Sequence, residues 1–171
     1  MFKSGDYVVY GANGLCHIDK VTTLSFSDDE KLYYCLTPVN DAKSQLFVPV
    51  GQTKVVMREP VSREEVDRII DELPDLDEVI PSSDRMREVK YKEVMQKDDC
   101  REWFRLLKTM YNRKRKRLAA GRKVTAMDER YTRAAEDNLF GELSFVLDKD
   151  KEDIENFVKD RFEQICETVE N

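Results

Sequence analysis

The chain has few of the features that membrane and secreted proteins require. Its 171 residues contain no apolar run of roughly 18 or more residues, the length that a membrane-spanning helix needs. The first ten residues, MFKSGDYVVY, lack the apolar stretch of a signal peptide. We therefore expect a cytoplasmic protein with no membrane contact.

Residues suited to metal binding are also scarce. The four cysteines (Cys16, Cys35, Cys100 and Cys166) are far apart in the sequence, and none forms a CxxC pair. His17 is the only histidine. Because a zinc site usually needs ligand pairs at short spacing, we expect free thiols, with no metal and no cofactor.

Catalytic motifs are missing as well. The sequence has no glycine-rich phosphate-binding loop and no GxSxG nucleophile elbow. Any histidine-dependent triad would have to use His17, which lies inside a strand-like run where a structural role is expected. We therefore predict a protein that is not an enzyme.

Charge is abundant and strongly segregated. Charged residues make up 37% of the chain and the mean hydropathy is -0.65, which favours two small domains over one large core. Residues 99–133 carry 12 basic and 4 acidic side chains, whereas residues 134–171 carry 4 and 12. The basic segment suits nucleic acid because binding to phosphates depends on the local field. Mutual neutralisation of the two segments is the other interpretation.

The first 60 residues read as β structure. Short β-rich runs recur at spacings of about ten residues and are separated by polar or glycine-containing turns; they are 7–10, 15–21, 24–26, 32–36, 45–50 and 54–57. This spacing predicts a small barrel of about five strands. Pro49 has no N–H group, so its strand is expected at an edge or ends there.

The rest of the chain reads as helix. Ser62 and Glu65 form a capping-box pattern that begins a helix over 62–73, and Pro74 ends it. Residues 74–83 resemble a linker. Further helices are expected over 84–97, 99–118, 125–146 and 150–169. We therefore predict an α+β chain with a β domain at 1–60, a capped helix and linker at 61–83, and an all-α domain at 84–171.

Two basic clusters stand out in the helical part. Residues 113–117 are consecutive cations at the end of a predicted helix, and Arg122 follows. A weaker stripe precedes them in the sequence and contains Arg85, Arg87, Lys90 and Lys92. Cations at a helix C-terminus complement its dipole, and charges on a helix face are often merely solvated. A DNA backbone is the alternative partner for both clusters.

Several of these motifs together resemble the CarD/CdnL family of transcription regulators, whose β domain also occurs in the transcription-repair coupling factor. The opening run 2–10 followed by Asn13-Gly14 resembles the family's first strand, and 46–50 resembles a later strand. The runs 91–95, 98–100, 106–111 and 128–143 resemble its helical half. The resemblance covers about residues 1–146 in order.

The resemblance implies a Tudor-like domain that binds the β subunit of bacterial RNA polymerase by strand pairing. The polymerase-contacting residues would be Thr23, Leu24, Phe26, Leu46, Phe47 and Pro49. The family often places arginines on these strands, but here the matching positions are Leu24 and Phe47. This interface is therefore expected to be more apolar.

The resemblance also implies that the helical domain contacts promoter DNA at the upstream edge of the transcription bubble and modulates open-complex stability. The expected DNA-contacting residues are Arg85, Arg87, Lys90, Lys92, Arg113, Lys114, Lys116 and Arg122. They would bind phosphates without reading sequence, and the protein would act as a monomer. Many family members insert a tryptophan as a wedge, but the matching segment 80–86 has none; Ile80 or Met86 is the available substitute, and Trp103 is expected in the core. A polymerase-bound adaptor with little DNA contact is the alternative.

Overall fold

The computed structural model describes residues 1–170, with side chains described for residues 1–168. Its N-terminal part is a five-stranded antiparallel sheet with the strand order β4-β3-β2-β1-β5. The strands are β1 (Tyr7–Tyr10), β2 (Leu15–Thr23), β3 (Leu32–Pro38), β4 (Leu46–Pro49) and β5 (Met57–Arg58). Helices make up the remainder, so the predicted α+β class with a Tudor-like sheet is confirmed.

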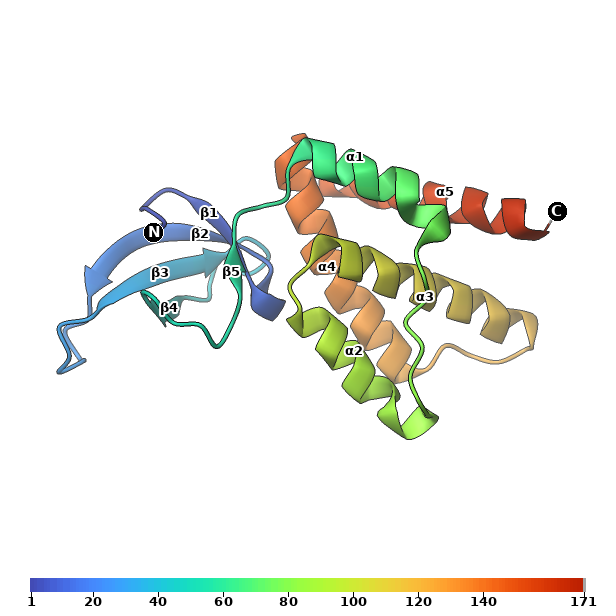
Figure 1. The fold of residues 1–171 in the computed structure, drawn as a ribbon, viewed down its shortest axis with the longest axis horizontal. Coiled ribbons are helices and arrows are strands. Elements are labelled where there is room, and N and C mark those ends of the chain that lie inside the picture. The colour runs from blue at the N-terminus through green and yellow to red at the C-terminus, as the bar shows by residue number, and fades with distance from the viewer. Residues whose placement is uncertain (171) are drawn as a thin grey trace.

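The sheet has its own small core on its concave side. Val8, Cys16, Ile18, Tyr34, Leu36 and Val48 form this cluster. The two edge strands approach each other, since Val48 of β4 and Met57 of β5 line the same hollow of about 330 Å³. A sheet whose two edges border one hollow is strongly curled. The strand order makes β4 and β5 the two edges of the sheet, and Figure 1 shows how strongly the sheet curves.

Two predicted strand segments differ in the structure. Residues 24–26 were expected to continue a strand, but β2 ends at Thr23. There the amide of Ser27 donates to the carbonyl of Leu24 (3.2 Å) and closes a turn. The last strand was expected over 54–57 and is instead β5, because the Gln52 side chain bonds the amide of Lys54 (2.9 Å) and holds that stretch in a loop.

Three short 3-10 turns accompany these elements: η1 (Gly11–Asn13) between β1 and β2, and η2 (Leu73–Asp75) and η3 (Asp84–Met86) in the helical part. The helices are α1 (Arg63–Glu72), α2 (Arg87–Gln96), α3 (Cys100–Ala119), α4 (Ala126–Leu147) and α5 (Lys151–Glu170). The predicted cap at Ser62 is confirmed, since its side chain accepts from the Glu65 amide at 3.1 Å, and Thr125 caps α4 in the same way by accepting from the Asp128 amide at 3.1 Å. The Glu65 carboxylate bonds Arg68, which lies on the next turn of α1.

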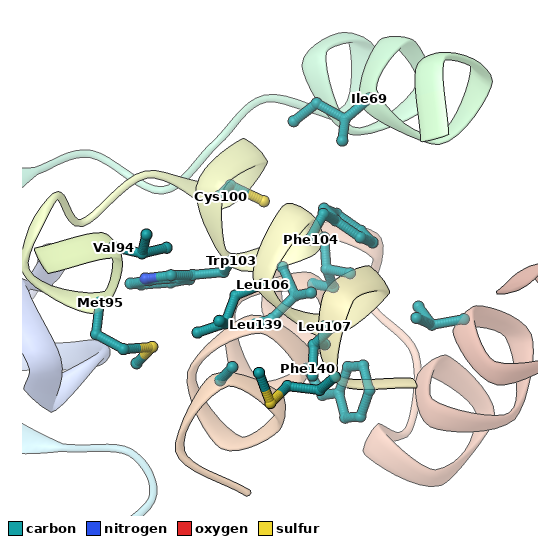
Figure 2. Packing of buried hydrophobic residues seen from close by; sticks show 14 of the residues in the cluster. Ile69, Val94, Met95, Cys100, Trp103, Phe104, Leu106, Leu107, Leu139 and Phe140 are labelled. Carbon is teal, nitrogen blue, oxygen red and sulfur yellow. The ribbon is translucent and has the colours of Figure 1, made fainter. Parts of the chain in front are cut away.

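One continuous hydrophobic core joins all five helices and reaches the sheet. β1 is buried on both faces, because Val8 packs in the sheet core whereas Val9 packs with the helices. Trp103 is fully buried, as expected, and Figure 2 shows its indole ring beside Val94 and Met95 of α2. The sheet and the helices therefore share apolar contacts across their junction.

Polar contacts fix the same junction. The guanidinium of Arg58, at the end of β5, donates to both carboxylate oxygens of Glu142 on α4 (2.6 and 2.9 Å). It also donates to the carbonyl of Asp98 (2.6 Å) and lies over the ring of Trp103, 5.5 Å from its centroid. The Glu142 carboxylate accepts the Val61 amide too (2.8 Å). We call Arg58, Asp98, Glu142 and Trp103 the junction clasp.

Asp98 has an unusual environment within the junction clasp. Its backbone adopts a φ of 50°, and its carboxylate accepts the amide of Gly11 at 2.9 Å. Only 2% of the residue is exposed, and Oδ1 has no hydrogen-bond partner among the described residues. Burial raises the pKa of Asp98 to about 6, because a charged carboxylate is poorly solvated there.

The four cysteines are free, as predicted. Within residues 1–170, no helix has both the length and the apolar character that crossing a membrane would require. The proposed boundaries at 60 and 83 stay a prediction. The segment after α1 does not stand apart from the helices, however, because Val79 is buried and its amide donates to Oγ1 of Thr109 (2.8 Å) on α3.

Candidate functional site

The first candidate surface is the edge of the sheet at β4. Among the described strands, β4 pairs only with β3, so one of its sides is open. The Val50 amide donates to the carbonyl of Leu32 (2.9 Å), which makes these two residues a hydrogen-bonded pair. In an antiparallel ladder such pairs alternate, so the backbone groups of Phe47 and Pro49 point away from β3.

This open edge offers a short set of backbone partners. Phe47 presents both an N–H and a C=O, whereas Pro49 presents only its C=O. The prediction that Pro49 lies at an edge or ends its strand is confirmed on both counts, since β4 is an edge strand and Pro49 is its last residue.

The outer face of β4 is aromatic. The ring of Phe47 is 43% exposed, and Phe26, at 75% exposed, packs edge-on against it with 6.1 Å between centroids. Phe26 reaches this position from the turn that follows β2, which Asp29 braces by accepting from Ser27 and pairing with Lys31 (3.2 Å). We call Phe26, Phe47 and Pro49 the aromatic edge.

The other predicted polymerase-contacting residues lie around the aromatic edge in different settings. Thr23 is exposed at the end of β2. Leu24 is half-buried in the turn. Leu46 is half-buried and packs against the sheet core. The structure thus places Phe26, Phe47 and Pro49 together on the outside, with Leu46 facing mainly inward.

The second candidate surface is a hollow of about 410 Å³ at the end of α3. Five cations from three parts of the chain line it: Arg87, Arg113, Lys116, Arg117 and Arg122. Its other lining residues include Glu78, Ile80 and Pro81 from the segment after α1. We call this surface the basic groove. It unites four of the predicted DNA-contacting residues that the sequence places in two separate clusters.

The end of α3 explains how Arg122 reaches the basic groove. Gly121 follows the helix with a φ of 72°, a left-handed conformation that glycine adopts without strain. The Arg122 amide then donates back to the carbonyl of Arg117 (2.8 Å). This reversal places Arg122 beside the last turn of the helix that carries Lys116 and Arg117.

Two cations of the basic groove are already paired with carboxylates. Arg87 donates to Asp84 (2.8 Å) and to the Tyr91 hydroxyl (3.2 Å). This hydrogen bond from Arg87 lowers the pKa of Asp84. Arg113 donates to Asp128 (2.6 Å), whose carboxylate is almost fully buried. Both arginines therefore hold the groove together as well as lining it.

The remaining cations of the groove are more available. Arg117 donates to the carbonyl of Lys123 (2.8 Å) and forms no ion pair with an acid among residues 1–168. Within residues 1–168, no hydrogen bond or ion pair engages the side chains of Lys116 and Arg122, and both residues are exposed. These two side chains are the ones best placed to bind an external anion.

The other predicted DNA-contacting residues lie outside this groove. Arg85 is exposed on η3. Lys90 and Lys92 lie on α2 near Glu93 (3.6 Å) and Glu88 (4.0 Å). Lys114 lines a different hollow, bordered by Phe162 of α5. The predicted set is therefore divided among at least two faces of the helical part.

Lys108 is a structural residue that the sequence patterns did not reveal. Its ammonium group donates to the carbonyls of Leu73, Pro74 and Leu76, at 2.9, 2.9 and 2.7 Å. It is only 8% exposed. A cation here complements the C-terminal end of α1 and anchors the segment that leads to Ile80. The sequence clue is a lysine immediately after Leu106-Leu107 on a buried helix face.

The comparison with protein families bears on the sheet. No curated protein matches the chain. The family model described as CarD-like/TRCF RID domain matches residues 2–61, about a third of the chain. The resemblance expected for the later helices stays a prediction. Residues 2–61, which contain the open β4 edge and all five strands, are thus similar to a CarD-like/TRCF RID domain, a kind of domain that interacts with RNA polymerase.

Proposed function

We propose that this protein is a transcription regulator that binds the RNA polymerase β subunit through β4 and contacts promoter DNA through the basic groove. The DNA contact lies near the upstream edge of the transcription bubble and modulates the stability of the open complex. The observation that carries this proposal is the groove itself, which gathers cations from α2, α3 and the turn after α3 beside the exposed Ile80.

The open edge of β4 supports strand addition by the polymerase. An added strand would bond to the N–H and C=O of Phe47 and to the C=O of Pro49. Each such hydrogen bond makes a net contribution of about 0.5–1.5 kcal/mol to binding. These bonds together supply less than the binding free energy of about 8 kcal/mol that micromolar affinity requires. Side chains beside the ladder must therefore contribute substantially to this interaction.

The basic groove supports phosphate binding without sequence readout. Lys116 and Arg122 are exposed cations, and a DNA backbone presents a dense row of negative charges. Three carboxylates (Glu78, Asp84 and Asp128) lie in or next to the groove and compensate part of its charge. The cations still outnumber these carboxylates, which suits DNA contact by a protein already held on the polymerase.

Ile80 supplies an apolar element at this site. It is 76% exposed and lines the same groove as the cations. An apolar side chain among phosphate-binding cations can support an unstacked base step, as wedge residues do in the minor groove. Met86 is 44% exposed but does not line the groove. Ile80 is thus the better placed of the two substitutes for a wedge tryptophan.

The test is open-complex lifetime on a promoter with cognate RNA polymerase and the full chain. Lys116→Ala combined with Arg122→Ala should shift the lifetime toward the value without the protein, while polymerase binding stays unchanged. Lys114→Ala is the matched control, since Lys114 is exposed on the same helix but lines another hollow. An unchanged lifetime in the double variant, together with a changed one in Lys114→Ala, would reject the basic groove as the DNA contact.

A polymerase-bound adaptor with little DNA contact is the second candidate. The observation that favours it is that Arg87 and Arg113 are committed to Asp84 and Asp128. Trp103 is also fully buried in the junction clasp and so unavailable to DNA. An open-complex lifetime unaffected by the wild-type protein, despite polymerase binding, would favour the adaptor.

A further inference from the structure

We infer that the polymerase segment that pairs with β4 is an apolar strand held by the aromatic edge, and that salt has little influence on this contact. This inference rests on the proposed function, because it names the chemistry of the partner at the same edge. It concerns the side chains that lie on either face of the added strand.

The first observation is the absence of charge on the strands concerned. The sequences of β3 (LYYCLTP) and β4 (LFVP) contain no acidic or basic residue. A strand added to β4 would lie beside Phe47 on the outer face, because directly opposite residues in a ladder share a face. An unpaired partner charge there would lose water without gaining a counter-ion.

The second observation is the arrangement of the two rings. Phe26 packs edge-on against Phe47, with an angle of 82° between the ring planes, and both rings remain exposed to solvent. An exposed aromatic pair next to an open sheet edge is stabilised most when another apolar group covers it. The partner residue opposite Phe47 is therefore an apolar side chain.

The third observation concerns the inner face of the added strand. Alternate partner side chains would point to the side of Val48, where a hollow of about 330 Å³ opens between β4 and β5. Its lining is largely apolar and includes Phe2, Val50 and Met57. Both faces of the added strand thus meet apolar surfaces, which selects a segment with consecutive apolar residues.

The experiment measures binding of the full-length chain to cognate core RNA polymerase at about 0.05 M and about 0.2 M salt. Wild-type affinity should change less than about threefold, since apolar contacts are not screened by ions. Phe47→Ala and Phe26→Ala should each weaken binding about tenfold, as central aromatic contacts usually do. Phe157→Ala is the control, because Phe157 is 50% exposed on α5, in the helical part.

Two more variants test the nature of the partner. Phe47→Arg should weaken binding more than Phe47→Ala, because it places a charge against an apolar side chain. Met57→Gln should weaken binding if it keeps the wild-type melting temperature. Tighter binding by Phe47→Arg, or a steep loss of wild-type affinity with salt, would show an acidic partner and overturn the inference. Absence of any polymerase binding at either salt concentration would instead remove the proposed function, and the inference with it.

Discussion

The guanidinium of Arg58 and the carboxylate of Glu142 form a two-point ion pair between β5 and α4, across 84 residues of sequence. Glu142 is fully buried, and the amide of Val61 is a third donor to it. This pair sits where the chain leaves the sheet and enters α1. This ion pair therefore helps to fix the open β4 edge relative to the basic groove, together with the apolar contacts across the junction.

Removal of the Glu142 charge should destabilise the fold strongly. We expect Glu142→Ala to lower the free energy of unfolding by about 3 kcal/mol, because Arg58 would lose its two-point partner and keep only the more distant carboxylate of Asp98, at 3.6 Å. Chemical denaturation monitored by circular dichroism measures this loss. Arg68→Ala is the control, since its pair with Glu65 lies on an exposed helix face and should contribute less than about 1 kcal/mol. Equal losses in the two variants would contradict a special role for the junction clasp.

Asp98 should make stability depend on pH in a defined window. Its pKa is about 6 in the folded protein and near 3.8 when solvated, so the folded state binds more protons between about pH 4 and pH 6. The Asp98 contribution to stability is therefore present below this window and is lost as pH rises through it. Asp98→Asn should remove this part of the slope and be the more stable protein at pH 7, by about 1–2 kcal/mol. Parallel stability curves for the two proteins from pH 4 to pH 7 would contradict this.

Lys108 should couple the fold to the basic groove. We expect Lys108→Met to cost about 2–3 kcal/mol, because three carbonyls lose their donor inside the protein. The segment bearing Glu78 and Ile80 should loosen, which would weaken the effect on open-complex lifetime while leaving polymerase binding intact. Urea denaturation and promoter-complex lifetimes measure the two effects. Lys114→Met, on the exposed part of the same helix, should change neither stability nor polymerase binding.

Substitutions at Gly14 and Gly51 allow the effect of backbone strain on stability to be distinguished from that of steric contact. A Cβ at Gly14 would lie 2.7 Å from Oδ1 of Asn138 on α4, and the φ there is 68°. A Cβ at Gly51 meets nothing within 4 Å, although its φ is 85°. Gly51→Ala should cost about 1–2 kcal/mol from the left-handed conformation alone. Gly14→Ala should cost more, and thermal unfolding of both variants would show whether the sheet and α4 are tightly fitted there.

Local patterns were enough to predict the elements that depend on neighbouring residues. The helix starts at Ser62 and Thr125 were predictable because each cap bonds an amide three residues later in the sequence. The end of β2 was not, because residues 24–26 are β-rich by composition but turn back through a hydrogen bond and the Asp29 contacts. The β propensity is a property of single residues, whereas the turn after β2 depends on contacts throughout the loop.

In the candidate sites, too, the residue types were predictable from the sequence, whereas their arrangement in space was not. The basic cations were visible in the sequence, but their division between faces was not. Lys114 and Lys116 are two residues apart on α3, yet only Lys116 lines the groove with Arg87. The roles of Lys108 and Glu142 were missed because charged residues are usually exposed. Glu142 lies directly before Leu143 and three residues after Leu139, two buried leucines on the same helix, and this position was the available clue.

The proline at the end of β4 has a consequence for solubility. An open edge strand can template the stacking of identical chains, and uncharged strands such as β3 and β4 are especially prone to this. Pro49 interrupts the row of donors after Phe47, so a second copy of β4 would gain few backbone bonds from pairing with the first. The edge can thus stay uncharged without promoting aggregation of the protein itself.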